Sequence, residues 1–209
     1  DQKKQENSSN DLHQFIESNY TKQEFRIPMR DGKKLFTTVY SPKDTSVSYP
    51  VLIKRTPYGL YYGKDVYPKK LGPSEFFTKE KFIFVYQDVR GRFMSEGTFM
   101  NMRPYIPEKE NDTIIDESTD AYDTIEWLLQ NLNNHNGKVG IWGISYPGFY
   151  ASMACIDAHD ALKAVSPQAP IADWYFDDFH HHGAFFLVHF FNFFQYFGQE
   201  RDSLVKQWP

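Results

Sequence analysis

The fold is decided by one stretch, GKVGIWGISYPGFYASMA, at residues 137–154. Its first part, KVGIW, is a short apolar run typical of a buried strand, and the small residues from Gly148 onward favour a helix. A single serine, Ser145, lies at the junction between the two. Such a serine either belongs to a tight turn or is a nucleophile that the turn holds above a sheet.

The residues around Ser145 agree with either role. A nucleophile turn is so tight that the residues two before and two after the serine must be very small, which gives the pattern G-x-S-x-G. Gly143 fits that pattern, but Gly148 comes one residue late and Pro147 takes its place. Proline is tolerated there if it lies in the first turn of the following helix. From these residues alone, a nucleophile and a structural turn both remain open.

Length and composition narrow the class of protein. A chain of 209 residues can bury one core and begin a second domain. The net charge of −4 gives no electrostatic reason to expect nucleic acid or an anionic membrane as a partner. Cys155 is the single cysteine, so no intrachain disulfide can form, and its place in the expected helix suggests a small core residue.

The rest of the chain alternates strands with helices. Asp31 and Gly32 predict a hairpin, and later apolar runs fit buried parallel strands. We expect strands at 24–29, 34–40, 50–55, 81–87, 138–142 and 162–165, and helices at 118–132 and 147–156. This order predicts an α/β fold with a mostly parallel sheet and antiparallel entry strands. Residues 1–22 are expected to form a polar N-terminal arm with one amphipathic turn.

The most apolar run, residues 185–197, is too short for a membrane span and includes His189, Asn192 and Gln195. We therefore expect no membrane insertion. The polar start DQKKQENSSN is what a mature chain shows after an upstream segment is removed. That start is compatible with a secreted or periplasmic protein, and the sequence leaves the compartment open.

The motif DVRGRF follows a predicted buried strand, where active-site loops of an α/β sheet lie. Arg90 in this motif could bind an anion. Asp88 beside it favours a structural ion pair instead.

The segment DWYFDDFHHHGAFF, residues 173–186, holds the densest group of titratable side chains. Asp177 and His181, like Asp178 and His182, are spaced i,i+4, so a helix would place carboxylate and imidazole on one face. That spacing fits half of a metal site, for which no other cluster supplies the remaining ligands. It also fits a solvated helix start with acidic residues near its N-terminus.

Three ordered motifs are similar to those of one serine hydrolase family. They are DVRGRFMSEG, EWLLQNLNNHNGKVGIWGISYPG and SPQAPIADW, at residues 88–97, 126–148 and 166–174. Over about residues 24–190 the chain resembles the family that joins cocaine esterase, X-Pro dipeptidyl-peptidases and α-amino-acid ester hydrolases. FMNMRP and DDFHHHGAF resemble the α-amino-acid ester hydrolase branch in particular. In this family the turn reads G-x-S-Y-x-G, so the resemblance accounts for the displaced glycine.

The resemblance implies an α/β-hydrolase fold and an acyl-transfer serine hydrolase that needs no cofactor. Ser145 is then the nucleophile. The donors to its oxyanion are the backbone N–H of Tyr146 and, in the RTPYG loop, the hydroxyl of Tyr58. Without the resemblance, Tyr58 would be interpreted as a packing residue of a Pro-Tyr-Gly turn.

The resemblance also implies a substrate class. In α-amino-acid ester hydrolases a carboxylate cluster binds the free α-ammonium of the acyl part, and the match falls on Asp178. This sequence has one residue fewer after Asp173, which makes Asp177 the other candidate. The expected substrates are small-molecule esters or amides, such as α-amino-acid esters or β-lactam-type amides. An X-Pro dipeptidyl-peptidase-like peptidase and a non-catalytic ligand-binding domain on a degenerate scaffold are the alternatives.

In this family the triad aspartate and histidine lie beyond the cap and precede a jelly-roll domain. We therefore expect residues 23–170 to be the N-terminal part of the hydrolase domain and residues 171–209 the start of a helical cap. The remainder of the enzyme would supply both triad residues, so this part alone is expected to be inactive. The polar arm, residues 1–22, would suit a homo-oligomer in which it wraps a neighbouring subunit.

Overall fold

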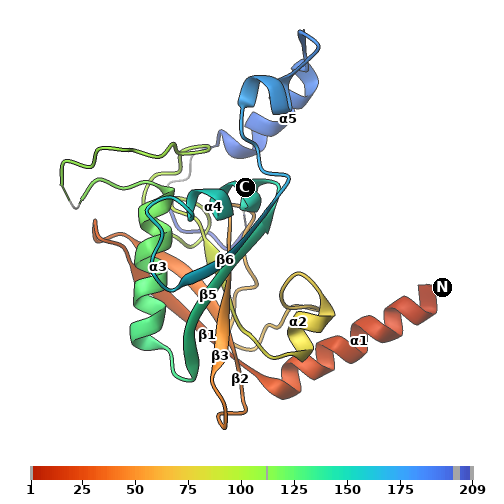
Figure 1. Ribbon diagram of the computed structural model, residues 1–209. Helices are drawn as coiled ribbons and strands as arrows, with labels where there is room; N and C mark the ends of the chain where they lie inside the picture. The colour runs from red at the N-terminus through yellow and green to blue at the C-terminus, as the bar shows by residue number, and fades with distance from the viewer. Residues whose placement is uncertain (1, 112, 200–202, 208–209) are drawn as a thin grey trace.

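A six-stranded sheet forms the centre of the structure, a computed structural model that describes residues 2–111, 113–199 and 203–207 (Figure 1). In chain order the strands are β1 (Tyr20–Pro28), β2 (Lys34–Pro42), β3 (Tyr49–Thr56), β4 (Ile83–Asp88), β5 (His135–Ile144) and β6 (Leu162–Gln168). Their order in the sheet is β1-β2-β4-β3-β5-β6. β2 is antiparallel to β1 and to β4, whereas the pairs β4–β3, β3–β5 and β5–β6 are parallel. The predicted mostly parallel sheet with antiparallel entry strands is confirmed.

The hairpin between β1 and β2 turns where the sequence predicted it. Gly32 has φ +82°, a left-handed conformation that glycine adopts without strain. Its N–H donates to the carbonyl of Met29 at 2.8 Å, and the Met29 N–H donates to Lys33 at 2.8 Å. The turn fixes the register in which Pro28 pairs with Lys34.

Helices cover both faces of the sheet (Figure 1). On one face lie α3 (Glu117–Asn131) and α4 (Tyr146–Met153), whose apolar side chains join those of the strands in one core cluster. On the other face, α1 (Gln2–Asn19) and the connection that includes α2 (Glu75–Lys79) pack on a second cluster. Both faces of β3 and β4 are covered, which explains why the sequences of these strands are mostly apolar.

Two expectations about helices are wrong. The N-terminal arm is the 18-residue helix α1 rather than one amphipathic turn, since Leu12, Phe15 and Ile16 form an apolar stripe that packs on the sheet. Helix α4 ends at Met153, two residues before Cys155, which is exposed and not a core residue.

After β6 the chain leaves the sheet and forms a group of short elements above α4 (Figure 1). It consists of a π-helical turn at Trp174–Phe179, a short hairpin of β7 (His180–His181) and β8 (Ala184–Phe185), and α5 (Leu187–Phe197). Phe193 and Phe197 of α5 pack against Tyr146 at the start of α4, with ring centroids 6.3 and 5.0 Å away. The division into a hydrolase domain at 23–170 and a cap at 171–209 stays a prediction. A helix with the length and apolar character of a membrane span is absent from the described part of the chain.

Candidate active site

Ser145 occupies a strained turn between β5 and α4. Its backbone angles are φ +62° and ψ −125°, a conformation that costs free energy in a residue with a side chain. The turn is held from both sides, because the Ser145 N–H donates to Gln168 O at 2.9 Å and its carbonyl accepts from Phe149 N at 3.1 Å. The Ser145 residue itself is exposed. Strain of this kind is retained at functional sites, where it presents a side chain that an ordinary turn would not.

The two glycines of the motif are required by close backbone contacts. A Cβ on Gly143 would lie 2.1 Å from the carbonyl oxygen of Pro147, and a Cβ on Gly148 would lie 2.6 Å from the oxygen of Gln168. Both distances are far below contact distance, so neither position accepts alanine without moving the backbone. Pro147 lies in the first turn of α4, where proline is tolerated. The second glycine is needed at position 148 because the backbone there lies against the end of β6 at Gln168.

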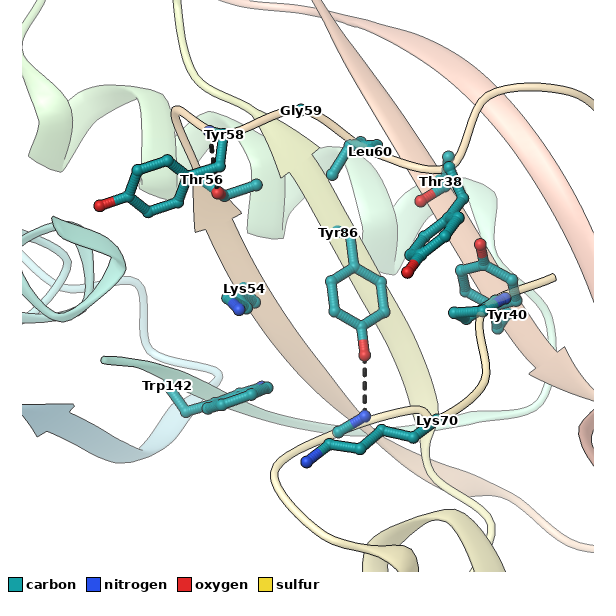
Figure 2. A pocket seen from close by; sticks show the side chains of 13 residues that line it. Thr38, Tyr40, Lys54, Thr56, Tyr58, Gly59, Leu60, Lys70, Tyr86 and Trp142 are labelled. Atoms are coloured by element: carbon teal, nitrogen blue, oxygen red, sulfur yellow. Dashed lines mark hydrogen bonds between the residues drawn. The ribbon is translucent and has the colours of Figure 1, made fainter. Parts of the chain in front are cut away.

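Tyr58 lies just beyond the end of β3, and its hydroxyl is near enough to the Ser145 side chain for the serine to lower the pKa of Tyr58. Burial of the hydroxyl raises the pKa of Tyr58, and this is the larger effect, against which the serine acts. The phenol is therefore protonated at neutral pH and can donate. The backbone N–H of Tyr58 donates to Thr56 Oγ1 at 3.2 Å, and this hydrogen bond fixes the start of the loop (Figure 2). The structure thus brings the two predicted side chains, Ser145 and Tyr58, together.

Tyr146 contributes through its backbone, because its side chain is engaged elsewhere. Its N–H is the first of α4, and the first N–H groups of a helix have no partner within the helix. Its buried hydroxyl accepts from Met102 N at 2.8 Å and donates to Asn101 Oδ1 at 3.0 Å. Its ring stacks on that of Tyr150, with centroids 5.2 Å apart. These contacts anchor the residue next to Ser145.

A cavity of about 250 Å³ lies beside the Tyr58 loop. Figure 2 shows Lys54 and Trp142 along it and the Tyr58 hydroxyl pointing away from it. The residues that line it do not include Ser145. The cavity is therefore behind the loop and not at the serine.

Asp177 and Asp178 have different environments. Asp177 is exposed, and its Oδ2 accepts from the N–H groups of Asp173 and Ala172 at 2.8 and 2.7 Å, which lowers its pKa. Asp178 is partly buried, and burial raises its pKa, while the nearby His189 acts in the opposite direction. The charge of Asp178 also raises the pKa of Tyr58, so this carboxylate lies within electrostatic reach of the Tyr58 hydroxyl.

The Asp-His segment does not form the helix that the metal and solvated-helix interpretations required. Residues 174–179 form a π-helical turn and residues 180–185 a hairpin, so Asp177/His181 and Asp178/His182 do not share a helical face. The hairpin forms because Gly183, with φ +84°, permits a tight turn. Within the described ranges, no group of three or more His, Cys, Asp or Glu side chains is placed to hold a metal ion.

Arg90 of the DVRGRF motif forms ion pairs inside the fold, as expected, but its partners are not Asp88. Arg90 pairs with Asp120, with Nη2 and Oδ1 2.6 Å apart, and with Asp31, with Nη1 and Oδ2 2.7 Å apart. Asp88 instead accepts a hydrogen bond from the Tyr62 hydroxyl at 2.9 Å. Asp88, the last residue of β4, and Arg90, two residues further on, thus have different partners.

The same region holds a buried carboxylate with a perturbed pKa. Glu117, at the start of α3, lies 3.1 Å from the Nη1 of Arg55. Burial raises the pKa of Glu117 to about 7. The charge of Asp120 also raises this pKa, whereas the charge of Arg55 lowers it. Glu117 is buried and paired with Arg55, so its role is assigned to the fold.

Sequence reasoning missed two residues near Tyr58. Arg92 donates from Nε to the carbonyl of Pro57 at 3.1 Å and from Nη1 to the carbonyl of Tyr196 at 3.5 Å. The Tyr196 side chain also acts on the pKa of Tyr58, raising it. Arg92 stood in the DVRGRF motif, but its partners are in distant segments that no local pattern links to it.

A nucleophile-type turn between strand and helix, on a mostly parallel sheet with antiparallel entry strands, defines the α/β-hydrolase fold. The sequence pattern of the X-Pro dipeptidyl-peptidase (S15) family matches residues 31–205, and the chain belongs to that family.

Similar proteins include the cocaine esterase of Rhodococcus sp. (strain MB1 Bresler), which is 32% identical over 164 residues, or 77% of this chain and 26% of the esterase. An aminopeptidase from the marine sediment archaeon Thaumarchaeota archaeon superposes with a TM-score of 0.75 and 37% identity, covering 91% of this chain and 32% of that one. An α-amino acid ester hydrolase gives a TM-score of 0.75 and 38% identity, covering 88% of this chain and 30% of that one. The chain thus spans between about a quarter and a third of the length of these relatives.

Proposed function

We propose that this chain carries the nucleophile of a serine hydrolase that cleaves esters or amides through an acyl-enzyme. Ser145 attacks the acyl carbonyl, and the Tyr146 N–H and the Tyr58 hydroxyl stabilise the oxyanion that forms. The observation that carries this proposal is the strained turn between β5 and α4, which leaves Ser145 exposed and which Gly143 and Gly148 make possible. The triad aspartate and histidine would come from the remainder of the enzyme, as the family resemblance implies.

For the substrate we propose the acyl group of an α-amino acid, with Asp178 binding its ammonium. Asp177 is less suited, because both its hydrogen bonds hold the backbone at residues 172–173. Asp178 is partly desolvated and lies close enough to Tyr58 to affect its pKa. Two of the similar structures are an aminopeptidase and an α-amino acid ester hydrolase, and both names imply a substrate with a free amino group. Amino-acid esters and β-lactam-type amides both fit this description.

Two other functions make different predictions. A peptidase that acts like an X-Pro dipeptidyl-peptidase is suggested by the family match and would require a dipeptide acyl group that ends in proline. A non-catalytic ligand-binding domain would form no acyl-enzyme with any of these compounds. Comparing single amino-acid esters with X-Pro amides as substrates of the complete enzyme separates the first two.

The oxyanion role of Tyr58 is tested by Tyr58→Phe in the complete enzyme. The change removes one hydroxyl and no packing volume, so kcat should fall by about 10²–10³ with little change in KM. Tyr61→Phe is the matched control, because Tyr61 lies in the same loop, is 56% exposed and should leave kcat unchanged. If Tyr58→Phe also retains the kcat of the wild type, Tyr58 is a packing residue.

A further inference from the structure

The loop that carries Tyr58 is held on both sides by two successive residues of the DVRGRF motif. Before Tyr58, the carbonyl of Pro57 accepts a hydrogen bond from Arg92 Nε at 3.1 Å. After Tyr58, the Phe93 ring lies against Gly59, so closely that a Cβ there would be 3.0 Å from the ring. The backbone on either side of the phenol is therefore fixed by neighbouring side chains.

Arg92 also connects this loop to α5. The side chain is fully buried, and its Nη1 donates to the carbonyl of Tyr196 at 3.5 Å. The guanidinium carbon lies 5.0 Å from the ring centroid of Tyr196 and 5.4 Å from that of Phe197. Phe197 in turn meets the Tyr58 ring edge-on, with centroids 5.8 Å apart. One guanidinium thus touches the loop backbone and the ring against which Tyr58 packs.

We propose that Arg92 is a positioning residue for the oxyanion donor: by binding the carbonyl of Pro57 and packing on the Phe197 ring it fixes the place of the Tyr58 phenol. This inference rests on the proposed oxyanion role of Tyr58. Oxyanion donors act because they are preorganised, and a displacement of about 1 Å can cost about 10²-fold in rate. Lysine would not replace the arginine, because it lacks the planar fork that reaches two carbonyl oxygens at once.

The test is a double-mutant cycle in the complete enzyme. Arg92→Lys and Arg92→Met are each made in the wild type and in Tyr58→Phe. In the wild type we expect kcat for an amino-acid ester to fall by about 10- to 100-fold, with KM changed by less than about twofold. In the Tyr58→Phe background the same changes should cost less than about twofold in kcat, because the group that Arg92 positions is already gone.

A matched control is Arg26→Met. Arg26 also donates to a loop carbonyl, that of Met94 at 2.9 Å, and lies over one ring, that of Phe36 at 5.8 Å, but its partners are not in the Tyr58 loop. It should leave kcat unchanged in both backgrounds. If Arg92→Met does not fold, Arg92→Lys, which keeps the charge and the apolar stem, provides the cycle.

The possible failures can be distinguished. If Tyr58→Phe alone leaves kcat unchanged, the oxyanion assignment fails and the role of Arg92 fails with it. If Tyr58→Phe slows turnover but the Arg92 variants lower kcat by the same factor in both backgrounds, Arg92 only supports the fold. That second result overturns this inference and leaves the proposed function standing.

Discussion

Replacing Asp178 by asparagine separates substrate recognition from catalysis. The change keeps the shape of the side chain and removes its charge. Asp178 is partly buried, so an ammonium bound to it would form an ionic hydrogen bond that water only partly screens. Such a bond contributes about 1.5–3 kcal/mol. Since about 1.4 kcal/mol is a factor of ten, kcat/KM for amino-acid esters should fall by about 10- to 100-fold.

The assay compares two esters that differ only in the amino group, phenylalanine methyl ester and 3-phenylpropionic acid methyl ester. Asp178→Asn in the complete enzyme should slow the first and leave the second nearly unchanged. The pH dependence provides a second readout. Burial raises the pKa of Asp178, so kcat/KM for the amino ester should fall as the pH is lowered through that pKa and the carboxylate becomes neutral. The loss of preference for the amino ester over the ester without an amino group should be missing in Asp178→Asn, whereas protonation of the triad histidine lowers turnover of both esters in both proteins.

Asp177→Asn is the matched control. An asparagine oxygen can still accept from the N–H groups of Ala172 and Asp173, so selectivity should be retained. Equal losses on both esters in Asp178→Asn would refute the reasoning, because a folding defect does not distinguish the substrates. A selective loss in Asp177→Asn would move the ammonium site to that residue.

Two further changes test the scaffold. Gly143→Ala places a methyl group 2.1 Å from Pro147 O, so ester hydrolysis and the thermal stability of the fold should both be lost; activity near that of the wild type would contradict the turn geometry. Glu117 has its pKa raised from 4.5 to about 7, so the folded state binds this proton more tightly than the unfolded chain does. Its contribution to the free energy of unfolding should therefore decrease as the pH rises from 4.5 to about 7, and denaturant titrations should show a flatter pH dependence for Glu117→Gln. The same slope in both proteins would rule out Glu117 as the titrating group.

The sheet was predictable because its signals are local. Asp31-Gly32 determines the hairpin by turn geometry, and the runs that became β3 and β4 are apolar because both faces are covered. The turn at Ser145 was recognisable for the same reason, since Gly143 and Gly148 are required by contacts within a few residues or with the next strand. The extended helix α1 was missed because the sequence of its N-terminal part is polar and its apolar stripe of Leu12, Phe15 and Ile16 spans little more than one turn.

The parts of the site that depend on distant contacts were not predictable from pattern. The Asp-His spacing suggested a helical face, but the turn at His182-Gly183 makes a hairpin instead. Arg92 was in view as a charged residue after a strand, yet its role depends on Pro57 and on α5. For Tyr58 the sequence alone favoured packing, and only the family resemblance pointed to the hydroxyl.

The most direct test of the account is whether Ser145 becomes acylated or phosphonylated. The complete enzyme is treated with a fluorophosphonate and digested. Mass spectrometry of the peptides then shows which peptide carries the added mass. We predict one adduct on the peptide that contains Ser145, none in Ser145→Ala, and a fall in ester turnover on the order of 10⁶ in that variant with its fold intact. An adduct on another residue, or most of the turnover retained in Ser145→Ala, would contradict the assignment of Ser145 as the nucleophile.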